Sequence, residues 1–98
     1  MGATGAMLSR SVTVANTLGL HARAAARFVH IASRFQSHVK VSRGSQTMDG
    51  KSIMGMLLLA ASAGTVLLLS TDGEDEQAAL NALCGFIETG FGEDTCSA

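Results

Sequence analysis

Apolar residues recur along this chain of 98 residues with two different periods, and the order of those periods limits the folds that it can adopt. From Arg10 to Ala15, Val12 and Val14 alternate with polar residues, which predicts a strand with one buried face. From Ala22 to Phe35 the period becomes helical. The apolar stripe of that expected helix consists of Ala25, Phe28, Val29, Ala32 and Phe35.

Period two returns after this helix. Val39 and Val41 alternate with polar residues, the turn signal Arg43-Gly44-Ser45 follows, and a second short strand is expected near Gln46 to Met48. The two strands predict a hairpin. A short helix is then expected from about Ser52.

The last third of the chain predicts one more strand and one more helix. The strand covers Thr65 to Ser70, and the helix runs from about Glu74 to Thr89 with Gly90 as its C-cap. Acidic residues occupy the first turn of this helix, where they favour the helix dipole. Its expected core positions are Leu80, Leu83, Cys84 and Ile87.

The resulting order is βαββαβα. No single helix here can bury its apolar stripe alone, so we expect a four-stranded antiparallel sheet with three helices on one face. This is the α+β class, an open-faced β-sandwich whose other face meets water. With 98 residues and 47% hydrophobic residues, one domain is expected over 8–91, with a short extension at 1–7 and a flexible tail at 92–98.

Residues 52–71 carry no charge, and twenty such residues could cross a bilayer. Two observations argue against a membrane span. The composition changes near Gly64 from Met/Leu/Ala-rich to strand-like sequence, and the stretch contains two glycines and the polar residues Ser62 and Thr65. We therefore expect a short helix, a turn and a buried strand, and no membrane insertion.

Charge and cysteine content narrow the function classes. Seven basic and one acidic residue give +6 through residue 51, and seven acidic residues give −7 afterwards. A folded basic face would attract an acidic partner or a phosphoryl group, unless interleaved strands mix the charges. Four phenylalanines without tryptophan or tyrosine disfavour nucleic-acid binding. The spacing of Cys84 and Cys96 and the lack of a signal peptide favour a reducing cytoplasm.

His21 stands where the Leu18-Gly19-Leu20 loop meets the helix that begins at Ala22. The first N–H groups of a helix lack intrahelical partners, and with the helix dipole they attract anions. That positive end disfavours imidazolium and would leave a neutral, nucleophilic imidazole. Gly19 permits close backbone approach, and Arg23 could bind an anion through two hydrogen bonds. The alternative is a histidine that only caps the helix.

Three motifs decide between these alternatives by resemblance. NTLGLHARAAARFVHIASRF, KSIMGMLLLAASAG and STDGEDEQAALNAL occur in the order and spacing of the HPr phosphocarrier proteins of the bacterial phosphotransferase system, which the chain resembles over about residues 8 to 91. The resemblance implies an open-faced βαββαβα sandwich that accepts phosphate from phospho-enzyme I and passes it to enzyme IIA domains. It implies that His21 is phosphorylated and that Arg23 assists. Ala24 departs from the usual proline, which we expect to loosen the first turn slightly.

The second motif begins at Lys51-Ser52. On physical grounds Ser52 caps a short helix, and Ile53, Met54 and Leu57 are expected to form an exposed apolar patch, although they could be core residues instead. The resemblance adds that a serine kinase or phosphorylase acts on Ser52 in many relatives, placing negative charge on a surface that also includes Arg27.

We therefore expect a phosphohistidine carrier that works in a relay and is not an independent enzyme. The alternative function is a regulatory binding module that acts through its docking surface. No metal is expected, because His30 and His38 are not at ligand spacing with each other or with the cysteines. We also expect a monomer without a cofactor. Whether the phosphate serves sugar transport or a regulatory branch depends on which enzyme IIA proteins the cell contains.

Overall fold

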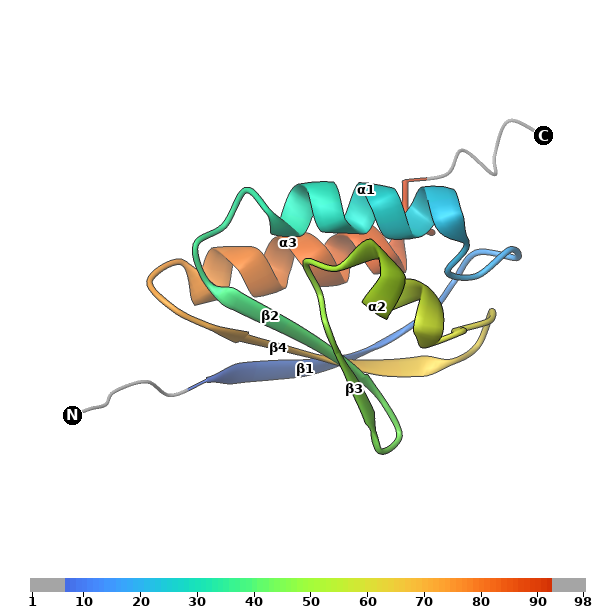
Figure 1. Cartoon of the computed structure of the whole chain (residues 1–98), viewed down its shortest axis with the longest axis horizontal. Helices are drawn as coiled ribbons and strands as arrows, with labels where there is room; N and C mark the ends of the chain where they lie inside the picture. The colour runs from blue at the N-terminus through green and yellow to red at the C-terminus, as the bar shows by residue number, and fades with distance from the viewer. Residues whose placement is uncertain (1–6, 93–98) are drawn as a thin grey trace.

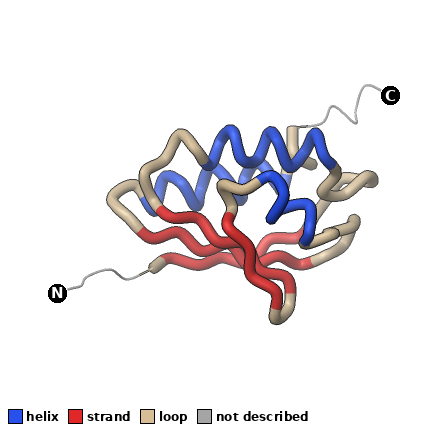
Figure 2. Tube along the Cα trace, in the orientation of Figure 1, coloured by secondary structure: helices blue, strands red, loops and turns tan. Residues whose placement is uncertain are grey.

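The computed structural model describes residues 7–92, and Figures 1 and 2 trace the chain. The expected extension at 1–7 and tail at 92–98 therefore lie almost wholly outside the described residues. The elements, in chain order, are β1 (Leu8–Thr13), α1 (Ala22–Ala32), β2 (His38–Arg43), β3 (Gln46–Asp49), α2 (Ile53–Leu58), β4 (Val66–Asp72) and α3 (Glu76–Glu88).

The four strands form one antiparallel sheet in the order β1-β4-β2-β3, and the three helices cover one of its faces (Figure 2). The last strand of the sequence therefore lies between the first strand and the hairpin. Its register pairs Val12 of β1 with Leu67, and Val41 of β2 with Leu69. The expected open-faced βαββαβα sandwich is confirmed.

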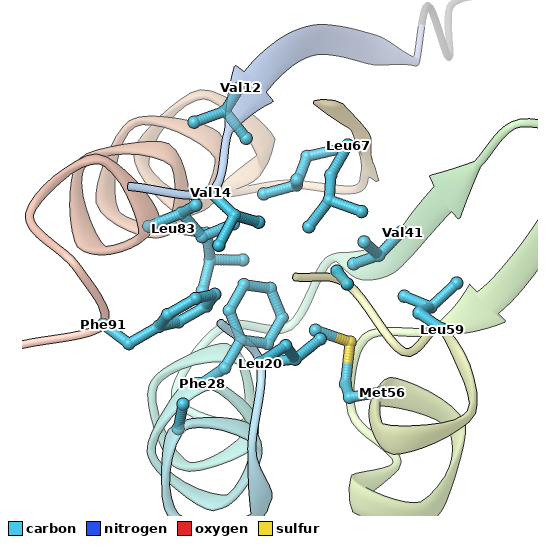
Figure 3. Close-up of a cluster of buried hydrophobic side chains, with 14 of the residues drawn as sticks. Val12, Val14, Leu20, Phe28, Val41, Met56, Leu59, Leu67, Leu83 and Phe91 are labelled. Carbon is cyan, nitrogen blue, oxygen red and sulfur yellow. The ribbon is translucent and has the colours of Figure 1, made fainter. Parts of the chain in front are cut away.

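The core lies between the sheet and the helices. Period-two residues of the strands meet the helical stripes there, and Figure 3 shows Val12, Leu67 and Val41 converging on Phe28, Met56 and Leu83. All four expected core positions of α3 are buried, whereas Val29 and Phe35 of the α1 stripe are half-buried. The other sheet face is open. It carries hydroxyl pairs such as Ser9–Ser70 at 3.0 Å and Ser42–Thr47 at 2.8 Å.

α1 is the middle helix. It packs against α2 on one side and α3 on the other, while α2 and α3 barely touch. It runs antiparallel to α3, because Asp75 at the start of α3 holds the segment after α1, while Gly90 after α3 lies against Asn16 before α1. The uncharged stretch divides into α2, a turn and β4, as expected. Within residues 7–92 no helix is long and apolar enough to cross a membrane.

Four expected boundaries need correction. β4 covers Val66–Asp72 rather than 65–70, because Thr71 pairs with Leu8 of β1 and Asp72 pairs with His38 of β2. β1 covers Leu8–Thr13 rather than 10–15, because Leu8 pairs with Thr71 while Val14 leaves the ladder to bond the carbonyl of Thr65. α1 ends at Ala32 rather than Phe35. Its last turn tightens into i→i−3 bonds.

α3 covers Glu76–Glu88 rather than 74–89. The Asp75 side chain accepts no capping hydrogen bond from the N–H groups of its own helix. Its carboxylate accepts hydrogen bonds from the backbone N–H groups of Gln36 and Ser37, both at 2.9 Å, and from the Ser37 hydroxyl. These bonds hold the pKa of Asp75 below its ordinary value, the Ser37 hydroxyl having the largest influence. The α1–β2 connection is thus fastened to the start of α3.

Candidate functional site

His21 is the N-cap of α1. Its backbone is extended, and its half-buried imidazole turns back over the first turn of the helix. Nδ1 accepts hydrogen bonds from the N–H groups of Arg23 at 3.2 Å and Ala24 at 3.5 Å. A nitrogen that accepts hydrogen bonds carries a lone pair, so in the neutral ring the proton lies on Nε2. The capping atom is therefore Nδ1, the nitrogen that carries a lone pair in the neutral ring.

The loop before His21 is held from both sides. Leu20 N–H donates to the carbonyl of Ala61 at 2.8 Å, and the buried side chain of Asn16 donates from Nδ2 to the Gly19 carbonyl at 2.9 Å. His21 N–H bonds the same Gly19 carbonyl at 3.1 Å. Within this held loop Leu18 is 71% exposed and Thr17 beside it is also exposed, whereas Gly19 and Leu20 are buried. The backbone that aims the imidazole is therefore fixed by contacts distant in sequence.

Gly19 is required for this anchoring. Its φ is +69°, and a Cβ placed there would stand 2.6 Å from the Ala61 carbonyl oxygen and 2.9 Å from Ser62 Cα. The expected close backbone approach is real, but it is directed at the loop after α2. This loop-to-loop contact joins the His21 loop to the end of α2.

Arg27 is exposed as expected, but it faces a groove on the α3 side of α1 and not the surface that carries Ser52. Arg27, His30 and Arg34 line a groove with Phe86 of α3. The patch expected at Ile53 and Met54 lies on α2, across α1 from that groove. Arg27 and the apolar patch therefore lie on opposite sides of α1 and do not adjoin one another. Arg27 lies on the side of the helix that faces α3.

Ser52 is the N-cap of α2, and its Oγ accepts a hydrogen bond from Gly55 N–H at 3.0 Å. Ile53 is 45% and Met54 67% exposed, as expected. The expectation that Leu57 is exposed is wrong, because its side chain is half-buried against the core.

The exposed leucine that sequence reasoning missed is Leu58, at 57%. Met56 and Leu59 are buried and lie three positions apart, so they mark the inner face of α2. Leu58 falls on the outer face.

The two capped helix starts lie far from each other. Lys51 Nζ donates to the Phe35 carbonyl near the end of α1, whereas the end of α2 meets the His21 loop.

Within residues 7–92 no three His, Cys, Asp or Glu side chains gather as metal ligands would. Cys84 is a buried free thiol whose pKa is raised by burial, so it packs as a small apolar side chain. The chemistry that the described residues offer at the site is that of an imidazole nitrogen held beside the backbone N–H groups of Arg23 and Ala24.

The chain is similar to known proteins. Residues 8–89 match the PTS-HPr family, described as the PTS HPr component phosphorylation site. The phosphocarrier protein HPr of Cupriavidus necator is 51% identical over 87 residues, covering 89% of this chain and 98% of that protein. The HPr of Xylella fastidiosa is also 51% identical, over 89 residues, covering 91% of this chain and 100% of that protein.

A solved structure is similarly close. The crystal structure of HPr-C-His from Thermoanaerobacter tengcongensis superposes with a TM-score of 0.84 at 42% identity, covering 89% of this chain and 98% of that one. Residues 8–89, which match the family, include the four strands, the three helices and both capped helix starts.

Proposed function

Because this chain belongs to the HPr family of phosphocarrier proteins, we propose that His21 is its phosphoryl acceptor. In this proposal phospho-enzyme I supplies the group and enzyme IIA domains receive it, in the cytoplasm. The observation that carries the proposal is the position of His21 Nδ1, within 3.5 Å of two helix N–H groups.

The geometry supports Nδ1 as the attacking atom. Its lone pair forms the new bond to phosphorus while the bond between phosphorus and the donor breaks, and the donor keeps that electron pair. The imidazole gives up its hydrogen bonds from Arg23 and Ala24 in this step, so these N–H groups become available to the phosphoryl oxygens. Attack on phosphorus by an acceptor then breaks the N–P bond and restores the capped helix.

Arg23 is proposed to neutralise the phosphoryl group in transit. Its own N–H is one of the two donors at Nδ1, and its side chain is exposed at the start of α1, so a guanidinium could pair with the transferring oxygens. Ala24 stands where relatives usually have proline. It supplies the second N–H donor, which a proline could not. Phosphate binding is thus assigned to His21, Arg23 and the first turn of α1.

We assign partner docking to two surfaces that flank α1. Ile53 and Met54 supply exposed apolar area on α2, with Leu57 at the half-buried edge, and Arg27 supplies charge on the α3 side. A partner that is apolar at its centre and acidic at its rim fits this pair of surfaces. Enzyme I and the enzyme IIA domains are the proposed partners.

Phosphorylation of Ser52 by a kinase is proposed to regulate docking. The Ser52 Oγ lies one α2 length, about 9 Å, from the end of that helix, which adjoins the His21 loop. A phosphate there would not touch His21. It would place about −1.5 to −2 charge next to Ile53 and Met54, where it repels an acidic partner rim.

The test is labelling of the purified chain by enzyme I and radioactive phosphoenolpyruvate. We expect an acid-labile label on the wild-type chain, none on His21→Ala, and a full label on His30→Ala, which removes an exposed histidine from the same helix. Arg23→Gln should be labelled more slowly, by about tenfold or more, because a charged hydrogen-bond donor is lost.

A folded His21→Ala chain that is labelled as well as wild type would overturn the carrier assignment. A wild-type chain that binds enzyme I without being labelled would instead favour the regulatory binding module. Equal labelling rates for wild type and Arg23→Gln would remove Arg23 from the site.

A further inference from the structure

A groove of about 420 Å³ runs between α1 and the end of α3. Its apolar lining comes from Ala26, Ile31 and Phe86, and its basic lining comes from Arg27, His30 and Arg34. Apolar surface beside arginine side chains favours a ligand that is partly apolar and partly acidic. We therefore expect an occupant with acidic residues.

The described chain ends in this groove. Gly92 is one of its lining residues, and a Cβ on Gly92 would stand 2.9 Å from the ring of Phe86. Figure 1 shows the same segment, in red, rising from the end of α3 beside α1. The next residues in the sequence are Glu93-Asp94-Thr95-Cys96-Ser97-Ala98, which contain two acidic residues and no basic one.

We propose that residues 93–98 occupy the α1–α3 groove reversibly, with Glu93 and Asp94 facing Arg27, His30 and Arg34. The reach is sufficient. Arg27 and Ala32, the last residue of α1, are about 8 Å apart along the helix at 1.5 Å per residue, and Arg34 follows two residues later. Six extended residues span up to about 20 Å. Tethering at Gly92 raises the local concentration of the acidic residues, so even a weak attraction populates the contact.

The antiparallel packing of α1 and α3 gives the contact a direction. Gly90 lies near Asn16 at the start of α1, so the tail enters at that end and must run along the helix to reach Arg34. If Arg27 serves docking, as the proposed function has it, the tail competes with acidic partners for this arginine. The contact itself does not depend on that function.

A nitroxide spin label on Cys96 tests the contact in the intact chain, because Cys84 is buried and is not labelled. We expect the amide signals around Arg34 to lose about half or more of their intensity at low salt, where charge attraction is least screened, and to recover near 1 M salt. A tail that only extends from Gly92 would affect the start of α1 and leave the Arg34 end unchanged, which would overturn the proposal.

Matched variants separate charge from proximity. Arg34→Gln, and Glu93→Gln with Asp94→Asn, should restore the signals, whereas Lys40→Gln on the open sheet face should not. Signal loss that survives the tail substitutions would overturn the electrostatic contact. Signal loss in an isotope-labelled Cys96→Ser chain mixed with spin-labelled chains would show that a second copy fills the groove, which would overturn the intramolecular form. All of these outcomes are independent of phosphoryl transfer.

Discussion

The starts of α1 and α2 solve one physical problem with different atoms. Each helix exposes N–H groups that need acceptors, and each N-cap has extended backbone. At α2 a serine oxygen accepts one bond at 3.0 Å, whereas at α1 an imidazole nitrogen accepts two, at 3.2 and 3.5 Å. The serine bond has the usual length, and the imidazole bonds are at the long end of the range.

The contrast supports the proposal that the acceptor at α1 is also the reacting atom. Long hydrogen bonds cost little to give up, so Nδ1 can exchange them for a bond to phosphorus while phosphoryl oxygens take over the N–H groups. The α1 cap in turn needs a loop held by distant contacts, through Leu20 and Gly19, to aim the ring. The α2 cap is local, because Ser52 bonds only within its own turn region.

Replacing both caps by asparagine gives the largest contrast. Asparagine is a good N-cap, so His21→Asn and Ser52→Asn should each change the free energy of unfolding by no more than about 1 kcal/mol. Only His21→Asn loses the nucleophile, and its labelling by enzyme I should fall at least about a thousandfold. Denaturant unfolding and labelling, performed on both variants, check this. A similar loss of labelling in Ser52→Asn would make the two sites equivalent and contradict the assignment.

Alanine at Gly19 should break the loop that the α1 cap depends on. The new Cβ meets the Ala61 carbonyl in a left-handed conformation, so we expect a loss of about 3 kcal/mol in the free energy of unfolding. Gly44→Ala is the matched control, since its φ is +61° but its Cβ would meet nothing within 4 Å. It should lose only about 1 kcal/mol. If urea unfolding showed the same loss of stability for both variants, the contact between the new Cβ of Gly19→Ala and the Ala61 carbonyl would not be the cause of the destabilisation.

Ser52 variants separate the cap from the surface. Ser52→Ala should lose about 1 kcal/mol of stability and bind enzyme I nearly normally. Ser52→Asp should keep a capping oxygen but bind more weakly at low salt, because its charge repels an acidic partner. The weakening should shrink as salt rises, since the Debye length is about 8 Å at physiological ionic strength. Calorimetry at two salt concentrations would show equal affinities if charge at Ser52 has no effect.

Asp75 gives the smallest effect, and it depends on pH. Its folded-state pKa lies below the ordinary value of 3.8, so its ionised form stabilises the fold above that value. This stability is lost as pH falls through 3.8 toward the folded-state pKa. Asp75→Asn should therefore be less stable than wild type at neutral pH, and the difference should shrink in acid. A difference that stays constant down to about pH 2 would mean that the charged carboxylate is not the stabilising group.

Local patterns account for what the sequence predicts correctly. The element order follows from period-two and helical stretches, and the start of α1 follows from the change in pattern at His21 and Ala22. Helix ends are less accurate, because the end of α1 is set by the bonds of Asp75, 38 residues beyond Ser37. No pattern within α1 contains that information.

The candidate site divides in the same way. The position of His21 is predictable because capping is a local property. The side of α1 on which Arg27 lies depends on which helix packs against it. Leu58 is exposed in place of the expected Leu57, because a six-residue helix is too short for its period to identify the buried face. Tertiary packing, which the sequence pattern does not display, decides both.

The central position of β4 has a consequence for the order in which this protein can be made. Among the strands of the described residues, β1 pairs only with β4. During synthesis, residues 8–13 therefore have no strand to pair with until residues 66–72 have been made. Such pairing between distant segments is slow, because a long loop must close first. The loop that carries His21 leans on the segment just before β4, through Ala61. A nascent chain therefore acquires the geometry of the His21 loop only after residue 61 has been synthesised.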